Sequence, residues 1–384
     1  MKTDVTIVGA GLAGLIASIQ FSQIGYNVAC IDYKGEKNKK SDMRSTALLL
    51  PSINLLKTFG VWEQIKVNAC PLQAMRIRDL SDEKNIAEVK FHAKEIGEEQ
   101  FGYNVPNQNL YNNLVTFLNK TKNIKVIHND KFMNVRTRTN ATFIELKSGI
   151  RIQSKLLIGA DGRNSSVRDK LEIHVKTKTY NQHALAFKVK HEQPHENVST
   201  EIYRSGGPFT IVPLAEQNQS AIIWMDNTSK IRNLTKLDDD QFNNAITIRS
   251  GNCLGVLSRI SELTDWPIKS QITNNTVKER CVLIAEAAHV LPPIGAQGLN
   301  MSIQDIKALA DIVGKENDPG SMHLLSEYEK NRNRDSKLRA KLIHGLNLSS
   351  ISNKIHTQKA RSMAIQLIAS SPKLRSFLIE AGLG

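Results

Sequence analysis

The hydrophobic and polar positions at the start of the chain follow first a strand pattern and then a helix pattern. Residues 4–8 form a short apolar run typical of a buried strand. Residues 15–25 place apolar side chains at helical spacing and end at a glycine, and residues 27–32 form a second apolar run. These segments predict a β-α-β unit, and residues 44–65 continue in a mostly helical pattern.

Farther along the chain, the period of the pattern changes twice. Residues 72–104 and 176–230 are rich in strand-like segments separated by charged turns. Residues 155–171 predict a strand, a tight turn and a helix, residues 282–289 return to a buried apolar strand, and from residue 300 onward the pattern is nearly all helical. The fold class we predict is therefore α/β: a Rossmann-like dinucleotide-binding domain, interrupted in sequence by an antiparallel-sheet domain and followed by a helical C-terminus.

The same changes of pattern give the domain boundaries. We assign three segments to the α/β domain, two segments to the sheet domain and one to a basic helical tail: residues 1–71, 105–175 and 275–345; residues 72–104 and 176–274; and residues 346–384.

Composition places this chain among globular proteins. Of its 384 residues, 40% are hydrophobic, and no apolar run reaches the roughly 20 residues that a membrane-spanning helix needs. The N-terminus begins directly with a strand and lacks the pattern of a secretory signal, and the four cysteines are scattered without a C-x-x-C spacing. We expect a cytoplasmic protein, or one peripheral on the inner face of the membrane.

The formal net charge of +14 is concentrated near the C-terminus. Between Lys330 and Arg375 there are eleven Lys and Arg residues and one acid, Asp335. Two interpretations stay open, a solvated helical face and a surface attracted to anionic lipid. Nucleic acid is not an expected partner, because aromatic residues are 5% of the chain and no RNA- or DNA-binding motif is present.

A glycine-rich turn, GAGLAG, joins the first predicted strand to the first helix. In this context Gly9 makes the tight turn, Gly11 lets the backbone approach a pyrophosphate, and Gly14 packs the helix on the strand. Asp32 ends the second strand, where a carboxylate can bind ribose hydroxyls. Because an acid at this position repels a 2′-phosphate, the dinucleotide should be NAD or FAD and not NADP. An ordinary turn of an α/β fold is the alternative.

Two further motifs go beyond what a simple dehydrogenase needs. They are GADGRNSSVR (residues 159–168) and AEAAHVLPPIGAQGLNMSIQD (residues 285–305), each following an apolar strand. Together with GAGLAG, DMRSTAL (42–48) and GPFTIVPL (207–214), they resemble class A FAD-dependent aromatic monooxygenases over essentially the whole chain. Within that class the resemblance is closest to the ubiquinone-biosynthesis hydroxylases of the 2-polyprenylphenol and 2-octaprenyl-6-methoxyphenol hydroxylase type.

The resemblance implies a set of residues that bind FAD. Asp161 would serve both FAD and the nicotinamide cofactor, with Arg163 and Arg168 beside it, and Glu286 would bond the ribityl chain. A surface arginine is the alternative for Arg44, and the match at Gln108 is the weaker one. The complete implied set is Gly9, Gly11, Ala13, Gly14, Asp32, Arg44, Gln108, Asp161, Glu286, Gly295, Gly298, Leu299 and Asn300.

In one of these motifs the chain departs from the family pattern. The family usually has Gly-Asp-Ala-Ala-His, and this chain has Ala285 and Glu286 in place of the first two residues. The longer carboxylate and the added methyl group bring FAD affinity into question. After the motif, Gly295, Gly298, Leu299 and Asn300 would aim backbone N–H groups and a helix dipole at the flavin. We interpret His289 as a packing and hydrogen-bonding residue in preference to a base.

The implied reaction is hydroxylation of a phenol ring by FAD, NADH or NADPH, and O₂. FAD would be tightly and non-covalently bound, and the nicotinamide cofactor would be transient. No catalytic side chain is assigned, because the flavin performs the chemistry, and no metal site is predicted, because no spacing of metal ligands is present. Four residues are candidates for the substrate pocket, with plain core packing as the alternative for each: Phe209, Pro213, Trp224 and Pro293.

The implied substrate is a polyprenylated phenol in ubiquinone biosynthesis, and the basic tail suggests association with a membrane surface and with a quinone-biosynthesis complex. A homo-oligomer is also open. The alternatives are a soluble aromatic-compound hydroxylase and a non-catalytic flavoprotein subunit of a membrane-associated complex. A flavin halogenase is disfavoured, because Trp62, Trp224 and Trp266 are isolated in the sequence.

Overall fold

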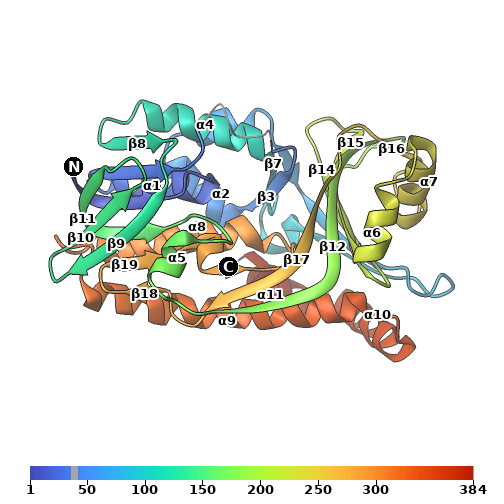
Figure 1. Ribbon diagram of the computed structural model, residues 1–384. Coiled ribbons are helices and arrows are strands. Elements are labelled where there is room, and N and C mark those ends of the chain that lie inside the picture. The colour runs from blue at the N-terminus through green and yellow to red at the C-terminus, as the bar shows by residue number, and fades with distance from the viewer. Residues whose placement is uncertain (36–41, 384) are drawn as a thin grey trace.

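The computed structural model of the chain describes residues 1–35 and 42–383. Figure 1 shows two sheet-based regions side by side, with the long helix α9 (Met322–Ile351) running along the bottom of both. The α/β region, the antiparallel-sheet region and the helical C-terminus confirm the predicted fold class.

The α/β region is built on an eight-stranded sheet. Its central strands run parallel in the order β19-β11-β1-β2-β8, and β9 and β10 extend it as an antiparallel hairpin on β11. Because parallel strands end at one edge, the loops after β1, β2, β11 and β19 all open on the same side of this sheet. The strands are β1 Lys2–Val8, β2 Val28–Asp32, β8 Ile124–His128, β9 Phe132–Arg138, β10 Ala141–Leu146, β11 Arg151–Gly159, β18 Val277–Lys278 and β19 Cys281–Leu283.

Helices on one face of this sheet form the largest apolar core. Helix α1 is buried along most of its length, because it packs on β1 and β2 and also meets α4 and α8, and its residues Leu15, Ile16 and Ile19 belong to this core. The opposite face is covered by β9, β10 and α5. The helices are α1 Leu12–Gln23, α2 Leu50–Thr58, α3 Trp62–Lys66, α4 Asn107–Asn119, α5 Ser166–Lys170, α8 Gln297–Val313 and the short 3₁₀ turn η3 Ala285–Ala287.

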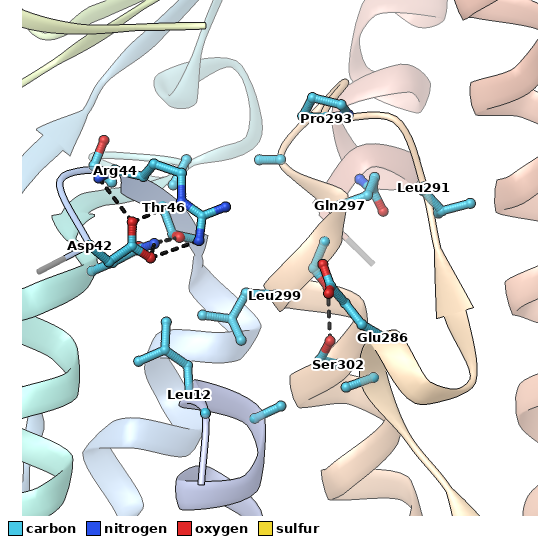
Figure 2. Close-up of a pocket in the computed structure, with 18 of the residues that line it drawn as sticks. Leu12, Asp42, Arg44, Thr46, Glu286, Leu291, Pro293, Gln297, Leu299 and Ser302 are labelled. Carbon is cyan, nitrogen blue, oxygen red and sulfur yellow. Dashed lines mark hydrogen bonds and ion pairs between the residues drawn. The ribbon is translucent and has the colours of Figure 1, made fainter. Parts of the chain in front are cut away.

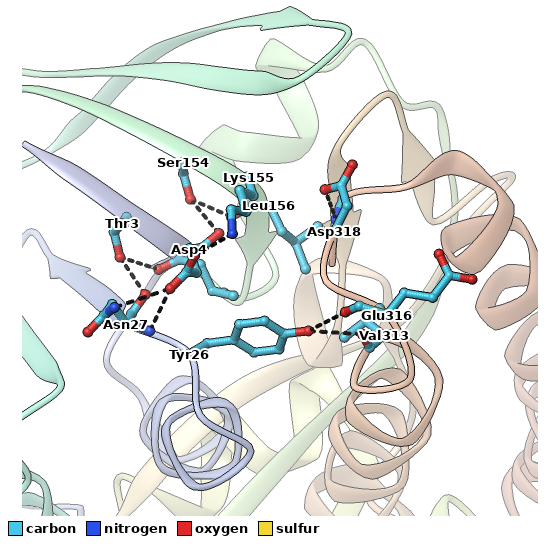
Figure 3. A network of polar contacts seen from close by, with 12 residues as sticks. Thr3, Asp4, Tyr26, Asn27, Ser154, Lys155, Leu156, Val313, Glu316 and Asp318 are labelled. Atoms are coloured by element: carbon cyan, nitrogen blue, oxygen red, sulfur yellow. Dashed lines mark hydrogen bonds and ion pairs between the residues drawn. The ribbon is translucent and has the colours of Figure 1, made fainter.

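Polar contacts fix the end of this sheet that is remote from the motif loops (Figure 3). The carboxylate of Asp4 accepts a hydrogen bond from the backbone of Asn27 at 3.0 Å and lies 2.8 Å from the ammonium of Lys155. The Tyr26 hydroxyl donates to the carbonyl of Val313 at the end of α8, at 2.9 Å. Segments that are far apart in sequence are therefore tied together around the start of β1.

The second region is a nine-stranded sheet in the order β20-β17-β12-β15-β14-β13-β5-β6, with β16 on β12. Helices α6 and α7 cover its outer face over a separate core. The pairing is antiparallel except between β13 and β5. The elements are β5 Ala74–Asp79, β6 Ala87–His92, η2 Ala93–Ile96, β12 Val175–His191, β13 Val198–Arg204, β14 Gly207–Pro213, β15 Gln219–Asn227, α6 Thr228–Leu234, α7 Asp239–Arg249, β16 Leu257–Arg259, β17 Thr264–Thr273 and β20 His289–Val290.

A three-stranded sheet, β3-β7-β4, lies between the two larger ones; its strands are β3 Ser45–Leu49, β4 Cys70–Leu72 and β7 Gly102–Pro106. The predicted helical pattern of residues 44–65 is therefore wrong for its first five residues after Arg44, which pair with β7 before α2 begins. The sequence boundaries assigned to the two domains stay a prediction.

The C-terminal helices pack against both regions. Helix α9 reaches from the eight-stranded to the nine-stranded sheet, and α10 (Ile355–Ser370) and α11 (Pro372–Leu383) follow it. Helix α10 lies against β5 and β6, where Ile365 is buried beside Phe91. The guanidinium of Arg361 also forms an ion pair with the buried Asp79 at 2.8 Å. These contacts make the tail part of the folded protein.

Candidate active site

A cavity of about 1720 Å³ lies between the motif loops of the eight-stranded sheet and one face of the nine-stranded sheet. Pockets for single small molecules commonly measure about 300–1,000 Å³. The cavity is larger, and its wall runs from the loop after β1, past the start of α8, to the C-terminal helices. It therefore has room for a dinucleotide together with a second molecule.

The GAGLAG turn forms one end of this cavity. Gly9 has a positive φ of 107°, and a Cβ on it would lie 2.4 Å from the carbonyl oxygen of Ala160. A Cβ on Gly14 would lie 1.8 Å from the carbonyl oxygen of Gly9, so the turn and α1 touch through their backbones. A Cβ on Gly11 would meet no atom within 4 Å. The turn is thus packed on its inner side and open toward the cavity.

The start of α1 faces the open space that Gly11 leaves. Gly11 is the N-cap of the helix and provides no side-chain cap, and Leu12 and Ala13 line the cavity. Uncapped N–H groups at a helix start carry partial positive charge and bind phosphate. Asp32, at the end of β2, is 4% exposed and also lies on the wall, where its Oδ1 accepts a hydrogen bond from the backbone of Lys34 at 3.2 Å.

Arg44 is held in a fixed position on the cavity wall (Figure 2). Its Nε and Nη2 atoms each lie 2.8 Å from the carboxylate of Asp42, and its guanidinium lies 5.5 Å from the ring centroid of Trp266. The side chain of Asn107 donates a further hydrogen bond to the Asp42 carboxylate at 2.9 Å. The backbone N–H of Asp42 donates to the side-chain oxygen of Gln108 at 3.3 Å. Burial alone would raise the pKa of Asp42, but the bond from Arg44 holds it below its usual value.

Asp42 and Trp266 were not singled out as site residues by the sequence. Asp42 falls within the DMRSTAL motif, which was the one available signal. Trp266 lies on β17, more than 200 positions from Arg44, and nothing local in the sequence indicates that the two meet.

Asp161 lies on the cavity wall, and its carboxylate also accepts hydrogen bonds from within the loop that it belongs to. Its carboxylate accepts hydrogen bonds from the hydroxyls of Ser165 and Ser166 and from the backbone of Val167. The carboxylate therefore fixes the loop between β11 and α5. Its predicted role toward FAD and the nicotinamide cofactor stays a prediction.

The Ala285-Glu286 pair occupies η3 beside this loop. Ala285 adopts a left-handed conformation with φ of 54°, which for a non-glycine residue costs roughly 1–2 kcal/mol, so the usual glycine of the family suits this backbone better. The Glu286 side chain is 49% exposed and forms an ion pair with Arg163, at 3.1 Å from its Nη2. Both residues line the cavity, and the effect of Glu286 on FAD affinity stays a prediction.

The loop before α8 also contributes to the wall. Gly295, with φ of 65°, and Gly298 have open space where a Cβ would be, and Leu299 lines the cavity with them. Helix α8 begins without a side-chain cap. The Asn300 side chain is 3% exposed, accepts a hydrogen bond from the backbone of Leu49 and donates to Ala47 and Ala296, and the predicted role of its backbone N–H group stays a prediction. Its side chain braces α8 against β3 and is absent from the cavity wall among the described residues.

His289 has the hydrogen-bonding role that we predicted for it. Its Nε2 lies 2.6 Å from Oδ2 of the buried Asp305, whose Oδ1 lies 2.9 Å from Nε of Arg332 on α9. Burial would raise the pKa of Asp305, but the adjacent His289 and Arg332 together lower it. This buried set joins β20, α8 and α9 directly behind the cavity.

Three of the four predicted pocket residues lie elsewhere. Phe209 and Trp224 stack edge to face, 5.5 Å apart, in the core under α6 and α7, on the face of the sheet away from the cavity. Pro213 is buried and does not line the cavity among the described residues. Pro293 does line it. Because side chains alternate across a strand, the wall is formed instead by the neighbouring positions Thr210, Val212 and Ile223.

The residues at the glycine-rich end fit FAD. The open space over Gly11, the uncapped start of α1 and the buried carboxylate of Asp32 supply a phosphate site and a ribose site at the correct ends of one β-α-β unit. The open space over Gly298 and the uncapped start of α8 lie on the same wall and would accommodate a flat ring at close range.

Comparison with known proteins agrees with this geometry. The profile of the family described as "FAD binding domain" matches residues 2–339. The "Ubiquinone hydroxylase UbiL" of Rhodospirillum rubrum is 28% identical over 342 residues, covering 87% of this chain and 79% of the relative. The "3-demethoxyubiquinol 3-hydroxylase" of Escherichia coli is 26% identical, covering 87% and 86%.

Solved structures give the same fold. The p-nitrophenol 4-monooxygenase PnpA of Pseudomonas putida superposes with a TM-score of 0.81 at 17% identity, covering 100% of this chain and 98% of that one. At this identity, the likeness concerns the fold.

Proposed function

The chain belongs to the FAD-binding domain family of FAD-dependent monooxygenases, and from that premise we propose that it hydroxylates the aromatic ring of a polyprenylated phenol in ubiquinone biosynthesis. FAD is its cofactor, and NAD(P)H and O₂ are the co-substrates typical of the family. The observation that carries the proposal is the continuity of the cavity from the dinucleotide end, across the sheet, to an apolar end under the C-terminal helices.

Each part of the chain has a distinct task in this reaction. FAD supplies the redox chemistry that activates O₂. The N–H groups at the start of α1 would hold its pyrophosphate, and Asp32 would accept hydrogen bonds from its adenosine ribose. The start of α8 would bring partial positive charge to the flavin ring system as negative charge builds up on it. Arg44, fixed by Asp42 and Trp266, adds a positive charge to the same wall.

The remote end of the cavity suits a prenyl chain. Its wall is mostly apolar and comes from strands β5 and β6 and from helices α9, α10 and α11: Met75, Ile77, Phe91, Leu346, Ile368, Leu378 and Ile379. Burying apolar surface contributes about 25 cal/mol per Å², so each isoprene unit that enters such a lining strengthens binding. A small soluble substrate would leave this part of the cavity without a matching occupant.

We further propose that the C-terminal helices dock on an anionic membrane surface. Four of the basic residues from Lys330 to Arg375 are engaged with carboxylates inside the protein: Arg332, Arg339, Arg361 and Arg375. The other seven are exposed: Lys330, Arg334, Lys337, Lys341, Lys354, Lys359 and Lys373. The same helices expose large apolar side chains: Leu338, Leu342, Leu346, Ile355, Met363, Leu367 and Phe377.

Ile365 does not belong to this exposed set, because it is buried against Phe91. Among the described residues, no helix is both long and apolar enough to cross a bilayer. Exposed basic residues near an anionic surface contribute roughly 1 kcal/mol each, and exposed apolar side chains can enter the interface.

The docking proposal predicts sedimentation with vesicles that contain anionic phospholipid and release at high salt. We expect Phe377→Ser, which removes an apolar side chain that is 64% exposed, to weaken this binding. Ile248→Ser removes one that is 60% exposed on α7 and should leave the binding unchanged. Equal sedimentation with neutral vesicles, or equal loss in both variants, would count against docking through the C-terminal helices.

The function itself is tested with the purified protein. We expect released flavin near one per chain on denaturation, and NAD(P)H oxidation that rises on addition of a prenylated phenol, with a product that has gained one oxygen atom. Bound flavin without substrate-dependent oxidation would favour a non-catalytic subunit. Oxidation that responds equally to phenols without a prenyl chain would favour a soluble aromatic hydroxylase.

A further inference from the structure

The floor of the cavity contains one buried carboxyl group whose position the fold does not explain. The pairing of β15, β14, β13 and β5 places four wall residues side by side in one row across the sheet: Ile223, Thr210, Glu201 and Ile77. Among the described residues, Glu201 is the one carboxylate that the nine-stranded sheet contributes to this wall. Its cross-strand neighbours carry no charge.

Glu201 is only partly satisfied inside the protein. Glu201 is 5% exposed. Its Oε1 accepts a hydrogen bond from the hydroxyl of Tyr203, which lies two positions farther along β13. No described residue donates a hydrogen bond to Oε2. Burial raises the pKa of Glu201 above its ordinary value, and the bond from Tyr203 offsets this effect in part. A buried carboxyl without its full set of partners is costly, so a purely structural account of it is incomplete.

The charged groups near the pair do not supply a structural reason for it. Arg361 on α10 lies 5.2 Å from the ring centroid of Tyr203, but its guanidinium forms two hydrogen bonds with Asp79, at 2.8 and 3.0 Å. Arg361 and Asp79 therefore compensate each other, and Glu201 is not needed as a counter-ion. On the remaining neighbouring strand, Thr210 offers a hydroxyl and no charge.

We propose that Glu201 is a catalytic residue that binds the ring hydroxyl of the substrate and accepts its proton. This inference rests on the proposed function, because it requires a phenol on the cavity floor. The O–H bond of the phenol breaks, the proton forms a new O–H bond at Oε2 of Glu201, and the electron pair stays on the phenol oxygen. Electron density then rises at the ring carbons ortho and para to that oxygen, where the oxygen atom is added. When the ring regains its aromatic character, the C–H bond at the oxygenated carbon breaks, and its proton leaves with the second oxygen atom of O₂, which ends as water; Glu201 returns its own proton to the substrate oxygen.

The surroundings suit this task. A general base is most effective when its pKa lies near the operating pH, above the ordinary value of a carboxyl, and it takes the proton of a phenol, whose pKa is about 10, more readily as its own pKa rises. Burial moves the pKa of Glu201 upward from 4.5, toward that of the phenol. Ile77, directly across from Glu201 on β5, is apolar and offers the carboxylate no competing hydrogen-bond partner on that side.

The test is Glu201→Gln, which keeps the shape of the side chain and an acceptor for Tyr203 but cannot take a proton. We expect kcat for a prenylated phenol to fall by about 100-fold, within the range for loss of a general base, with flavin content and thermal unfolding as in the wild type. The acid limb of the pH profile of kcat/KM should disappear. Glu216→Gln, the same change in the exposed turn between β14 and β15, should retain the wild-type rate and profile.

Tyr203→Phe gives a second readout that a structural role would not produce. Since the bond from Tyr203 lowers the pKa of Glu201, its removal should move the acid limb of kcat/KM to higher pH and leave the rate on the plateau little changed.

A Glu201→Gln protein that hydroxylates within about twofold of the wild type and keeps its acid limb would overturn the inference, as would a loss of rate explained by lost flavin or lost folding. A wild-type protein that binds FAD but does not act on phenols would instead overturn the proposed function, and this inference with it.

Discussion

Gly11→Val is expected to leave a folded protein that no longer retains flavin. Gly11 has extended backbone angles, φ −74° and ψ −179°, which valine adopts readily, and a Cβ there meets no protein atom within 4 Å. The added side chain would instead occupy the space over the start of α1, where the pyrophosphate is expected to pass. We expect FAD affinity to fall by about 100-fold or more, or roughly 3 kcal/mol. The measurements are flavin per chain and FAD titration of the apoprotein.

Gly14→Ala provides the contrast, because the two glycines do different work in the same turn. A Cβ on Gly14 would lie 1.8 Å from the carbonyl oxygen of Gly9, so the smallest possible side chain separates α1 from the turn. We expect this variant to fail to fold, whereas unfolding of apo Gly11→Val should remain within about 0.5 kcal/mol of the wild type. Full flavin retention in Gly11→Val would show that the cofactor does not pass over this residue.

The fold could be predicted largely because its signals are local. A strand, a glycine-rich turn and a helix of fixed spacing specify a β-α-β unit, and the loops after β1 and β11 then meet because parallel strands end at one edge. Gly9 confirms this kind of reasoning, since its φ of 107° and its contact with Ala160 are what a tight turn against a neighbouring strand requires.

The substrate wall could not be predicted in the same way, because the face of a strand depends on which side the rest of the chain covers. Phe209 and Trp224 are large and apolar, and the sequence gives no indication that α6 and α7 cover their face. Alternation then places Thr210 and Ile223 in the cavity. Glu201 was missed for the same reason, since a polar residue in a strand ordinarily indicates a solvent-exposed face.

Contacts between segments that are distant in the chain are the second structural feature that the sequence does not reveal. Asn300 belongs to a motif that is associated with the cofactor, yet its side chain reaches β3, about 250 positions away in the sequence. Four of the basic residues that suggested a charged surface are paired with carboxylates, three of them from distant elements and one, Arg339, from its own helix. The three pairings with distant elements depend on tertiary packing, which no local pattern encodes.

Asp305→Asn is expected to destabilise the protein by about 3–5 kcal/mol, because it removes the charge that compensates two buried groups. Asp305 is 1% exposed and lies 2.6 Å from Nε2 of His289 and 2.9 Å from Nε of Arg332. The substitution conserves volume and creates no cavity, so the loss measured by denaturant unfolding reports the interactions. Arg332 would retain Asp335, at 3.0 Å, as its remaining carboxylate partner.

Asp311→Asn is the matched control, since it makes the same change on the same helix in an exposed pair. Asp311 lies 2.6 Å from Lys307, and both side chains are more than half exposed. Such i,i+4 pairs contribute about 0.3–0.5 kcal/mol, so the two variants should differ by several kcal/mol. Equal effects would show that the buried set behind the cavity does not stabilise the fold.

The pH dependence of unfolding gives an independent check on Asp305. Burial acts to raise the pKa of this carboxyl, but His289 and Arg332 lower it overall from its ordinary value of 3.8. A carboxyl whose pKa is lowered in the folded state contributes its full stability above the unfolded value and loses it as the pH falls through the folded one. The wild type should therefore lose stability below about pH 4, where Asp42 and Asp79, whose pKa values are also lowered, contribute in the same sense.

Asp305→Asn lacks one of these carboxyls, so its free energy of unfolding should fall less steeply over this range, and the difference between the two proteins should narrow as the pH decreases. A difference that stays constant from pH 7 to pH 3 would mean that the charge of Asp305 contributes nothing, and that the loss at neutral pH comes from packing.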